Sequence, residues 1–110
     1  MARNTQGDYV AVSSRGNFYM TWQQGQEFWQ PHNRPTARRL QNMGWTPSDK
    51  LWLSTRGGDV MLSAQPGLAA ETFEDIQINS RGFGILDVGW VLRVAGGGGG
   101  WGGRGGFICS

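Results

Sequence analysis

The sequence predicts an all-β fold of short antiparallel strands, and three observations support this prediction. Glycine accounts for 19 of the 110 residues and only 16% of the residues are charged, a composition that disfavours a helical bundle. Apolar and polar residues alternate in short runs, and each run ends at a cluster of Gly, Pro, Asn or Asp. No segment shows a convincing period of about 3.6 residues. The chain is therefore expected to form a β-meander.

The first four expected strands are separated by "RGN", "QQGQ" and "NRPTA", which are residues that reverse a chain. These strands are Tyr9 to Ser14, Asn17 to Trp22, Glu27 to His32 and Arg38 to Thr46. The last four are separated by "RGGD", "QPGLAA" and "NSRGFG", and "PSD" precedes the first of them. They are Lys50 to Thr55, Asp59 to Ala64, Glu71 to Ile78 and Ile85 to Val91.

The meander repeats itself within the chain. "SSRGNFYMTW" (Ser13 to Trp22) is similar to "STRGGDVMLS" (Ser54 to Ser63), and "LQNMGW" (Leu40 to Trp45) is similar to "ILDVGW" (Ile85 to Trp90). A repeat of roughly 40 residues with four short strands in each unit is typical of one blade of a β-propeller. We therefore expect a partial β-propeller of antiparallel four-stranded blades.

The two Gly-Trp endings are predicted to be the innermost strands of successive blades. Gly44 and Gly89 would allow neighbouring sheets to approach closely, and Trp45 and Trp90 would fill the wedge between them.

The predicted organisation is one full blade, Arg38 to Ile78, plus parts of two neighbours. We expect an N-terminal extension over residues 1–8, the partial propeller over 9–95 and a Gly-rich tail over 96–110. A section of a propeller leaves blade faces and strand edges open, which soluble proteins normally avoid. A partner that covers them is therefore expected.

Four segments carry a resemblance to a known family: "YVAVSSRGNFYMTW", "GQEFWQPHNRPTARRLQNMGW", "LWLSTRGGDV" and "FEDIQINSRGFGILDVGW". Together they resemble the photosystem II stability/assembly factor family of cyanobacteria, algae and plants, over residues 9–95. The resemblance implies a seven-bladed propeller, in the thylakoid lumen or on its precursor membrane, that escorts the photosystem II reaction-centre core during assembly. It implies docking through an Arg-rich surface and no catalysis. The segment "VAGGGGGWGGRGGFICS" departs from the family pattern.

The resemblance also implies where this chain acts and with which partners. The expected role is that of a non-catalytic photosystem accessory or assembly protein, peripheral on the lumenal side of the chloroplast thylakoid. The expected partners are photosystem membrane-protein subunits in a large complex, with lipid or pigment as further candidates at the interface.

Candidate partner-binding residues follow from strand parity. In four-stranded antiparallel blades, the turns between second and third strands and the connections between blades emerge on the same side. The arginines placed there are Arg15, Arg34, Arg38, Arg56 and Arg81. Arg39 is expected to point across its strand from Arg38 and is ranked lower.

Guanidinium groups form bidentate contacts with carboxylates and phosphates, so this side is expected to bind acidic loops, a carboxylate tail or a lipid head group. The alternative is structural. In that interpretation the arginines cap strand ends, bond loop carbonyls or pair with Asp59, Asp75 or Asp87.

Composition narrows the chemistry that the chain can perform. One cysteine allows no internal disulfide and one histidine, His32, allows no ordinary zinc site, so neither a metal nor another cofactor is expected. His32 is expected to be a buried hydrogen-bonding residue. No apolar run approaches the roughly 18 residues of a membrane span. No enzyme activity is expected.

Two other functions remain open from the sequence. The chain could be a section of a longer propeller scaffold. The segment "GGGGGWGGRGG" could bind single-stranded RNA, although it holds only one Arg-Gly-Gly triplet and the formal net charge is +2, so nucleic acid is not the expected partner.

Overall fold

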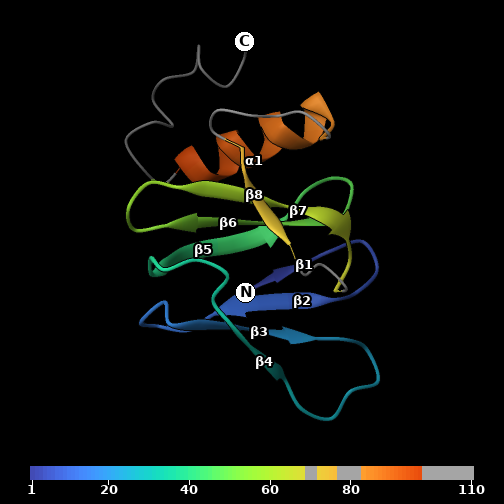
Figure 1. Ribbon diagram of the computed structural model, residues 1–110. Helices are drawn as coiled ribbons and strands as arrows, with labels where there is room; N and C mark the ends of the chain where they lie inside the picture. Colours follow the sequence, from blue (N-terminus) through green and yellow to red (C-terminus); the bar gives the residue numbers. More distant parts are fainter. Residues whose placement is uncertain (69–71, 77–82, 98–110) are drawn as a thin grey trace.

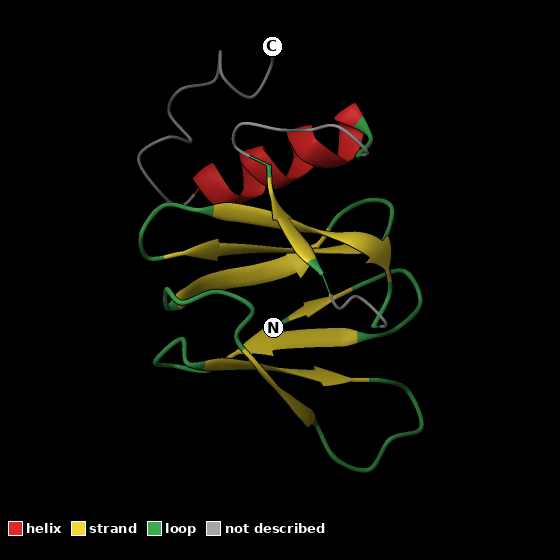
Figure 2. Cartoon of the chain, viewed as in Figure 1, coloured by secondary structure: helices red, strands yellow, loops and turns green. Residues whose placement is uncertain are grey.

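The computed structural model describes residues 1–68, 72–76 and 83–97, which form three stacked layers (Figures 1 and 2). Two layers are four-stranded antiparallel sheets, with strand orders β1-β2-β3-β4 and β5-β6-β7-β8. The third layer is a helix, α1, and the second sheet lies between α1 and the first sheet (Figure 1). The elements are β1 (Ala2–Arg3), β2 (Tyr9–Val12), β3 (Phe18–Trp22), β4 (Gln30–Asn33), β5 (Leu40–Trp45), β6 (Lys50–Thr55), β7 (Val60–Pro66), β8 (Phe73–Asp75) and α1 (Ile85–Gly97).

The expected antiparallel four-stranded blades are confirmed. Consecutive strands pair within each sheet, as in a meander. The first sheet also has four strands, because β1 pairs with β2 through Ala2 opposite Val10 and Arg3 opposite Tyr9. Residues 1–8, which the sequence analysis assigns to an extension, thus supply the first strand of this sheet.

A hydrophobic core lies between the two sheets because side chains alternate along each strand. It consists of Val10, Tyr19, Leu40, Met43, Trp45, Leu51 and Leu53, each of which is buried. Burial of one such large side chain stabilises a fold by about 1.5–3 kcal/mol. Met43 and Trp45 both face this core, whereas Gly44 between them faces the opposite side, where the Trp52 ring lies against it.

The prediction of a strand over Ile85 to Val91 is wrong, because this segment is the beginning of α1. The helix packs its buried face, which includes Val88, Val91 and Leu92, on the second sheet and completes a second core there. A strand needs a neighbour for its backbone N–H and C=O groups, but the sequence that follows is Gly-rich and has no alternating run. A helix pairs these groups internally.

The two Gly-Trp endings are therefore not the same structural element. The close approach at Gly44 is not the expected one between neighbouring sheets, because an added Cβ would lie 2.8 Å from the ring of Trp52, which belongs to β6 of the same sheet. The corresponding expectation for Gly89 is wrong, because an added Cβ there would meet no heavy atom within 4 Å.

Candidate functional site

Five of the six predicted site arginines lie at one end of the two sheets, where the β2–β3 turn, the β4–β5 connection and the β6–β7 turn come together. We call this group the arginine end. It consists of Arg15, Arg34, Arg38, Arg39 and Arg56. The sixth predicted residue, Arg81, lies outside the described residues.

The β2–β3 turn rests directly on the beginning of β5. The Leu40 backbone N–H donates to the Gly16 carbonyl oxygen at 2.9 Å. Gly16 has a φ of 73°, which favours glycine, and an added Cβ would overlap the Leu40 backbone. The glycine thus allows the contact that brings Arg15 next to the second sheet.

Hydrogen bonds between loops hold the arginine end together. The Arg39 guanidinium donates to the Arg15 carbonyl oxygen at 3.5 Å, and the Arg56 guanidinium donates to that of Ser14 at 3.4 Å. The Arg56 backbone N–H donates to the Arg39 carbonyl oxygen at 3.0 Å. Arg39 therefore belongs to this group, although strand alternation predicts that it points across its strand from Arg38.

Arg38 and Arg34 also have protein partners. Arg38 Nε lies 3.2 Å from Asp59 Oδ2, and its side chain crosses Gly57, where an added Cβ would overlap it. Since 62% of the Arg38 side chain is exposed, the pair stabilises the fold by about 0–1 kcal/mol. Arg34 Nη1 donates to Asn17 Oδ1 at 3.3 Å.

The arginine end keeps an excess of positive charge. Within the described part of the chain, only the Arg38 guanidinium pairs with a carboxylate, that of Asp59, while three others donate to neutral carbonyl or amide oxygens. Arg15 is exposed and its guanidinium contacts no described acceptor. The other arginines thus make the structural contacts of the alternative interpretation, and the arginine end still carries an excess of positive charge. Such a surface is suited to carboxylate or phosphate groups.

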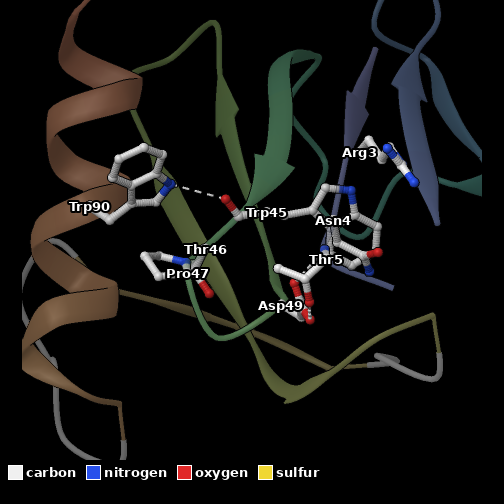
Figure 3. Close-up of a pocket in the computed structure, with 8 residues that line it drawn as sticks. All are labelled: Arg3, Asn4, Thr5, Trp45, Thr46, Pro47, Asp49 and Trp90. Atoms are coloured by element: carbon white, nitrogen blue, oxygen red, sulfur yellow. Dashed lines mark hydrogen bonds between the residues drawn. The ribbon is translucent and has the colours of Figure 1, made fainter. Parts of the chain in front are cut away.

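A groove lies beside β5, between β1 and α1, and sequence reasoning missed it (Figure 3). It comprises pockets of about 460 and 330 Å³ that share Arg3, Trp45 and Trp90 in their walls. We call it the tryptophan groove. The Trp90 indole N–H donates to the Trp45 carbonyl oxygen at 3.0 Å, and the Trp45 indole N–H donates to that of Ala2 at 3.2 Å. The two Gly-Trp endings were the sequence feature that could have indicated this groove, because Trp45 and Trp90 both line it.

One end of the tryptophan groove is closed by a contact between two turns. The Asp49 carboxylate accepts hydrogen bonds from the Thr5 backbone N–H, at 3.0 Å, and from the Thr5 hydroxyl. These residues lie on the β1–β2 and β5–β6 turns, at the end of the sheets opposite the arginine end. The Asp49 carboxylate therefore links the two sheets through these hydrogen bonds.

The hydrogen-bonding role predicted for His32 is confirmed, although its side chain is half-buried and not buried as expected. Its ring stacks on Tyr19 at a centroid distance of 4.9 Å, and its Nε2 lies 2.8 Å from the Thr21 hydroxyl oxygen. Burial lowers the pKa of His32 from its ordinary value. The same burial effect raises the pKa of Tyr19.

In the described ranges, no three or more His, Cys, Asp or Glu side chains lie together in a way that could hold a metal ion. A helix that could span a membrane is likewise not found among the described residues.

Comparison with known proteins yields one family along the whole chain. The family model of the photosynthesis system II assembly factor YCF48 matches residues 1–110. The chain is 59% identical, over 88 residues, to the chloroplastic photosystem II stability/assembly factor HCF136 of Arabidopsis thaliana, covering 80% of this chain and 22% of that protein. It is 44% identical to the photosystem II assembly protein Ycf48 of Thermosynechococcus vestitus, covering 98% of this chain and 30% of that protein.

Two solved structures agree with this comparison. A structure of YCF48 bound to D1 peptide is 56% identical with a TM-score of 0.55, covering 56% of this chain and 20% of that one. A structure of YCF48 from Cyanidioschyzon merolae is 34% identical with a TM-score of 0.58, covering 72% and 26%. The chain thus spans less than a third of the length of each of these relatives. Their names describe assembly and stability factors and no enzyme.

Proposed function

Because the chain belongs to the photosynthesis system II assembly factor YCF48 family, we propose that it is a non-catalytic accessory or assembly protein that binds photosystem II core subunits. The observation that carries this proposal is the family match over residues 1–110. A solved relative is described as bound to D1 peptide, which supports a core-subunit polypeptide as the partner.

The arginine end is the proposed docking surface. Its guanidinium groups outnumber the described carboxylate that pairs with them, so an acidic loop or carboxylate tail would gain charge-assisted hydrogen bonds there. Each desolvated contact of this kind contributes about 1–3 kcal/mol. Open blade edges and a lipid head group or pigment at the rim of the interface are part of the same proposal.

We place the chain at the lumenal face of the chloroplast thylakoid. Relatives from Arabidopsis thaliana and Oryza sativa are described as chloroplastic, which supports the organelle. Protection of the chain from protease in intact thylakoids, and its loss after membrane rupture, is the expected result. Digestion in intact thylakoids would contradict this placement.

A second candidate function is that of a blade pair within a longer propeller scaffold. The observation that favours it is that the chain corresponds to only 22% of the Arabidopsis relative and 30% of the cyanobacterial one. Native purification separates the two proposals. Co-migration of the chain with chlorophyll-containing complexes supports the first, and recovery of its peptides from a larger polypeptide supports the second.

Charge reversal tests the docking surface. Arg15→Glu is the primary variant, because the Arg15 guanidinium contacts no described protein acceptor and its loss should leave the fold intact. The triple variant Arg15→Glu, Arg56→Glu and Arg81→Glu extends the test. We expect occupancy of photosystem complexes, measured by quantitative blotting, to fall about tenfold for the triple variant, as the loss of one to two charged contacts implies.

Arg93→Glu is the matched control for Arg15→Glu, since Arg93 is exposed on α1 and the substitution makes the same change of charge. Occupancy that falls equally for Arg93→Glu, or that is unchanged in the triple variant, would remove the arginine end from the proposal.

A further inference from the structure

We propose that the outer edge of β5 binds an extended peptide segment of a partner, which adds as a further strand to the second sheet inside the tryptophan groove. This inference rests on the proposed function only for the choice of the probe. It concerns a surface distinct from the arginine end, at the other end of the same sheets.

The register of β5 and β6 shows which backbone groups face outward. The Thr46 N–H donates to the Lys50 carbonyl oxygen at 2.8 Å, so Thr46 is a hydrogen-bonded position of this pair. In an antiparallel ladder such positions alternate. The backbone groups of Met43 and Trp45, at the positions in between, therefore point away from β6.

No described strand lies next to this edge, because β5 is the first strand of its sheet. One of the outward groups has a partner that supports the orientation: the Trp45 carbonyl oxygen accepts the Trp90 indole N–H. A strand edge without a neighbouring strand can pair with another extended chain. Met43 and the Trp45 N–H are the groups that an added strand would engage.

The walls of the tryptophan groove fit the side chains of such a strand. Trp90 and Val94 of α1 line one side, Ala2 and Arg3 of β1 line the other, and Trp52 of β6 also lines the groove. Side chains of an added strand would point alternately toward the β1 wall and toward the α1 wall of this largely apolar hollow. The groove borders β5 from Asn42 to Trp45 and continues to Pro47, a length of about 17 Å at roughly 3.3 Å per residue.

The chemistry of the edge identifies the occupant as an extended polypeptide. A row of backbone donors and acceptors is satisfied by the complementary row of another strand. A helix has already paired its backbone groups, and a lipid chain has none. In peptide recognition by strand addition, the backbone of β5 would pair with the backbone of the peptide, and the apolar walls would select its side chains.

The test uses the full chain and the D1 peptide, which is the ligand described for a solved relative. Fluorescence anisotropy measures binding of the labelled peptide, of a version N-methylated at every second residue, and of a version N-methylated at the intervening residues. Strand addition requires that one methylated version binds at least about tenfold more weakly while the other binds like the parent peptide. Hydrogen exchange at the Met43 and Trp45 amides should slow upon binding.

A matched pair of variants locates the site. Val94→Asp places a charge in the groove wall, whereas Ile85→Asp makes the same kind of change on the same helix at a side chain that is 83% exposed and not in the groove. Peptide affinity should fall about tenfold for Val94→Asp and stay within twofold for Ile85→Asp. The methylated peptides and amide exchange report on the parent chain, so they decide the question even if Val94→Asp folds poorly.

Each contrary outcome is decisive. Equal affinity of both methylated peptides, unchanged amide exchange, or no binding to the parent chain would overturn strand addition at β5. Loss of peptide binding in Arg15→Glu with normal binding in Val94→Asp would overturn it too, while leaving the arginine end as the docking surface. Photosystem occupancy in the charge-reversal variants tests the proposed function separately.

Discussion

Leu40–Trp45 and Ile85–Trp90 have similar sequences but different structures. The first is β5, an edge strand that pairs with β6 along its length. The second is the beginning of α1, which covers the opposite face of the same sheet (Figure 1). The pattern of one segment therefore does not decide its structure, because a strand also needs a neighbouring segment able to pair with it.

One property survives the change of structure. In each copy, the tryptophan of the Gly-Trp ending bridges to the preceding layer: Trp45 donates to Ala2 of the first sheet, and Trp90 donates to Trp45 of the second. The predicted position between neighbouring sheets is therefore confirmed for Trp45 and wrong for Trp90, which lies on α1. Their burial differs, since 7% of Trp45 and 41% of Trp90 is exposed.

Removing these two tryptophans in turn should change the stability of the fold most. Trp45→Ala should destabilise the fold by about 3–5 kcal/mol, because a buried aromatic side chain leaves a cavity. Trp90→Ala should cost about 1–2 kcal/mol, since the side chain is partly exposed and loses mainly a hydrogen bond and some apolar contact. Urea unfolding followed by circular dichroism measures both free energies. Equal losses would mean that the two copies pack alike.

The glycines of the two endings should respond in opposite directions. Gly44→Ala should destabilise the fold by about 1–3 kcal/mol, because its Cβ would press on the buried Trp52 ring. Gly89→Ala should stabilise it by about 1 kcal/mol, because alanine favours a helix interior and the new Cβ meets open space. Thermal or urea unfolding reports the sign. Destabilisation by Gly89→Ala would argue against a helix at this position.

The weakest of these effects should be a pH dependence of the unfolding free energy that comes from one residue of the first sheet. His32 lies in the first sheet and is the only histidine of the chain. Because burial lowers its pKa, the unfolded state binds a proton more readily than the folded state. The stability that neutral His32 contributes is present above its ordinary pKa of 6.5 and declines as the pH falls through that value.

Urea midpoints between about pH 5.5 and 7.5 measure this decline, in a window above the titration of ordinary carboxylates. His32→Gln should flatten the dependence. A dependence of equal slope in His32→Gln would assign it to other groups.

The second sheet and strands β2 to β4 of the first could be predicted from the sequence because they alternate, end at turn residues and occur in succession. Strand β1, which lies in the segment expected to be an extension, is not predicted. The gathering of Arg15, Arg38 and Arg56 at one end could be predicted too, because it depends only on the alternation of connections in a meander. The α1 helix could not be predicted, since Ile85 to Val91 has the pattern of a strand. Whether this segment forms a strand or a helix depends on the Gly-rich sequence after it, which has no alternating run to pair with it. The tryptophan groove depends on α1, so it could not be predicted either.

The most direct test of this comparison is the sign of the ¹³Cα secondary chemical shifts along the full chain in solution. The structure predicts positive values over Ile85–Gly97 and negative values over Leu40–Trp45. Negative values over both segments would mean that Ile85–Trp90 is a strand after all, and would contradict both α1 and the groove that it forms.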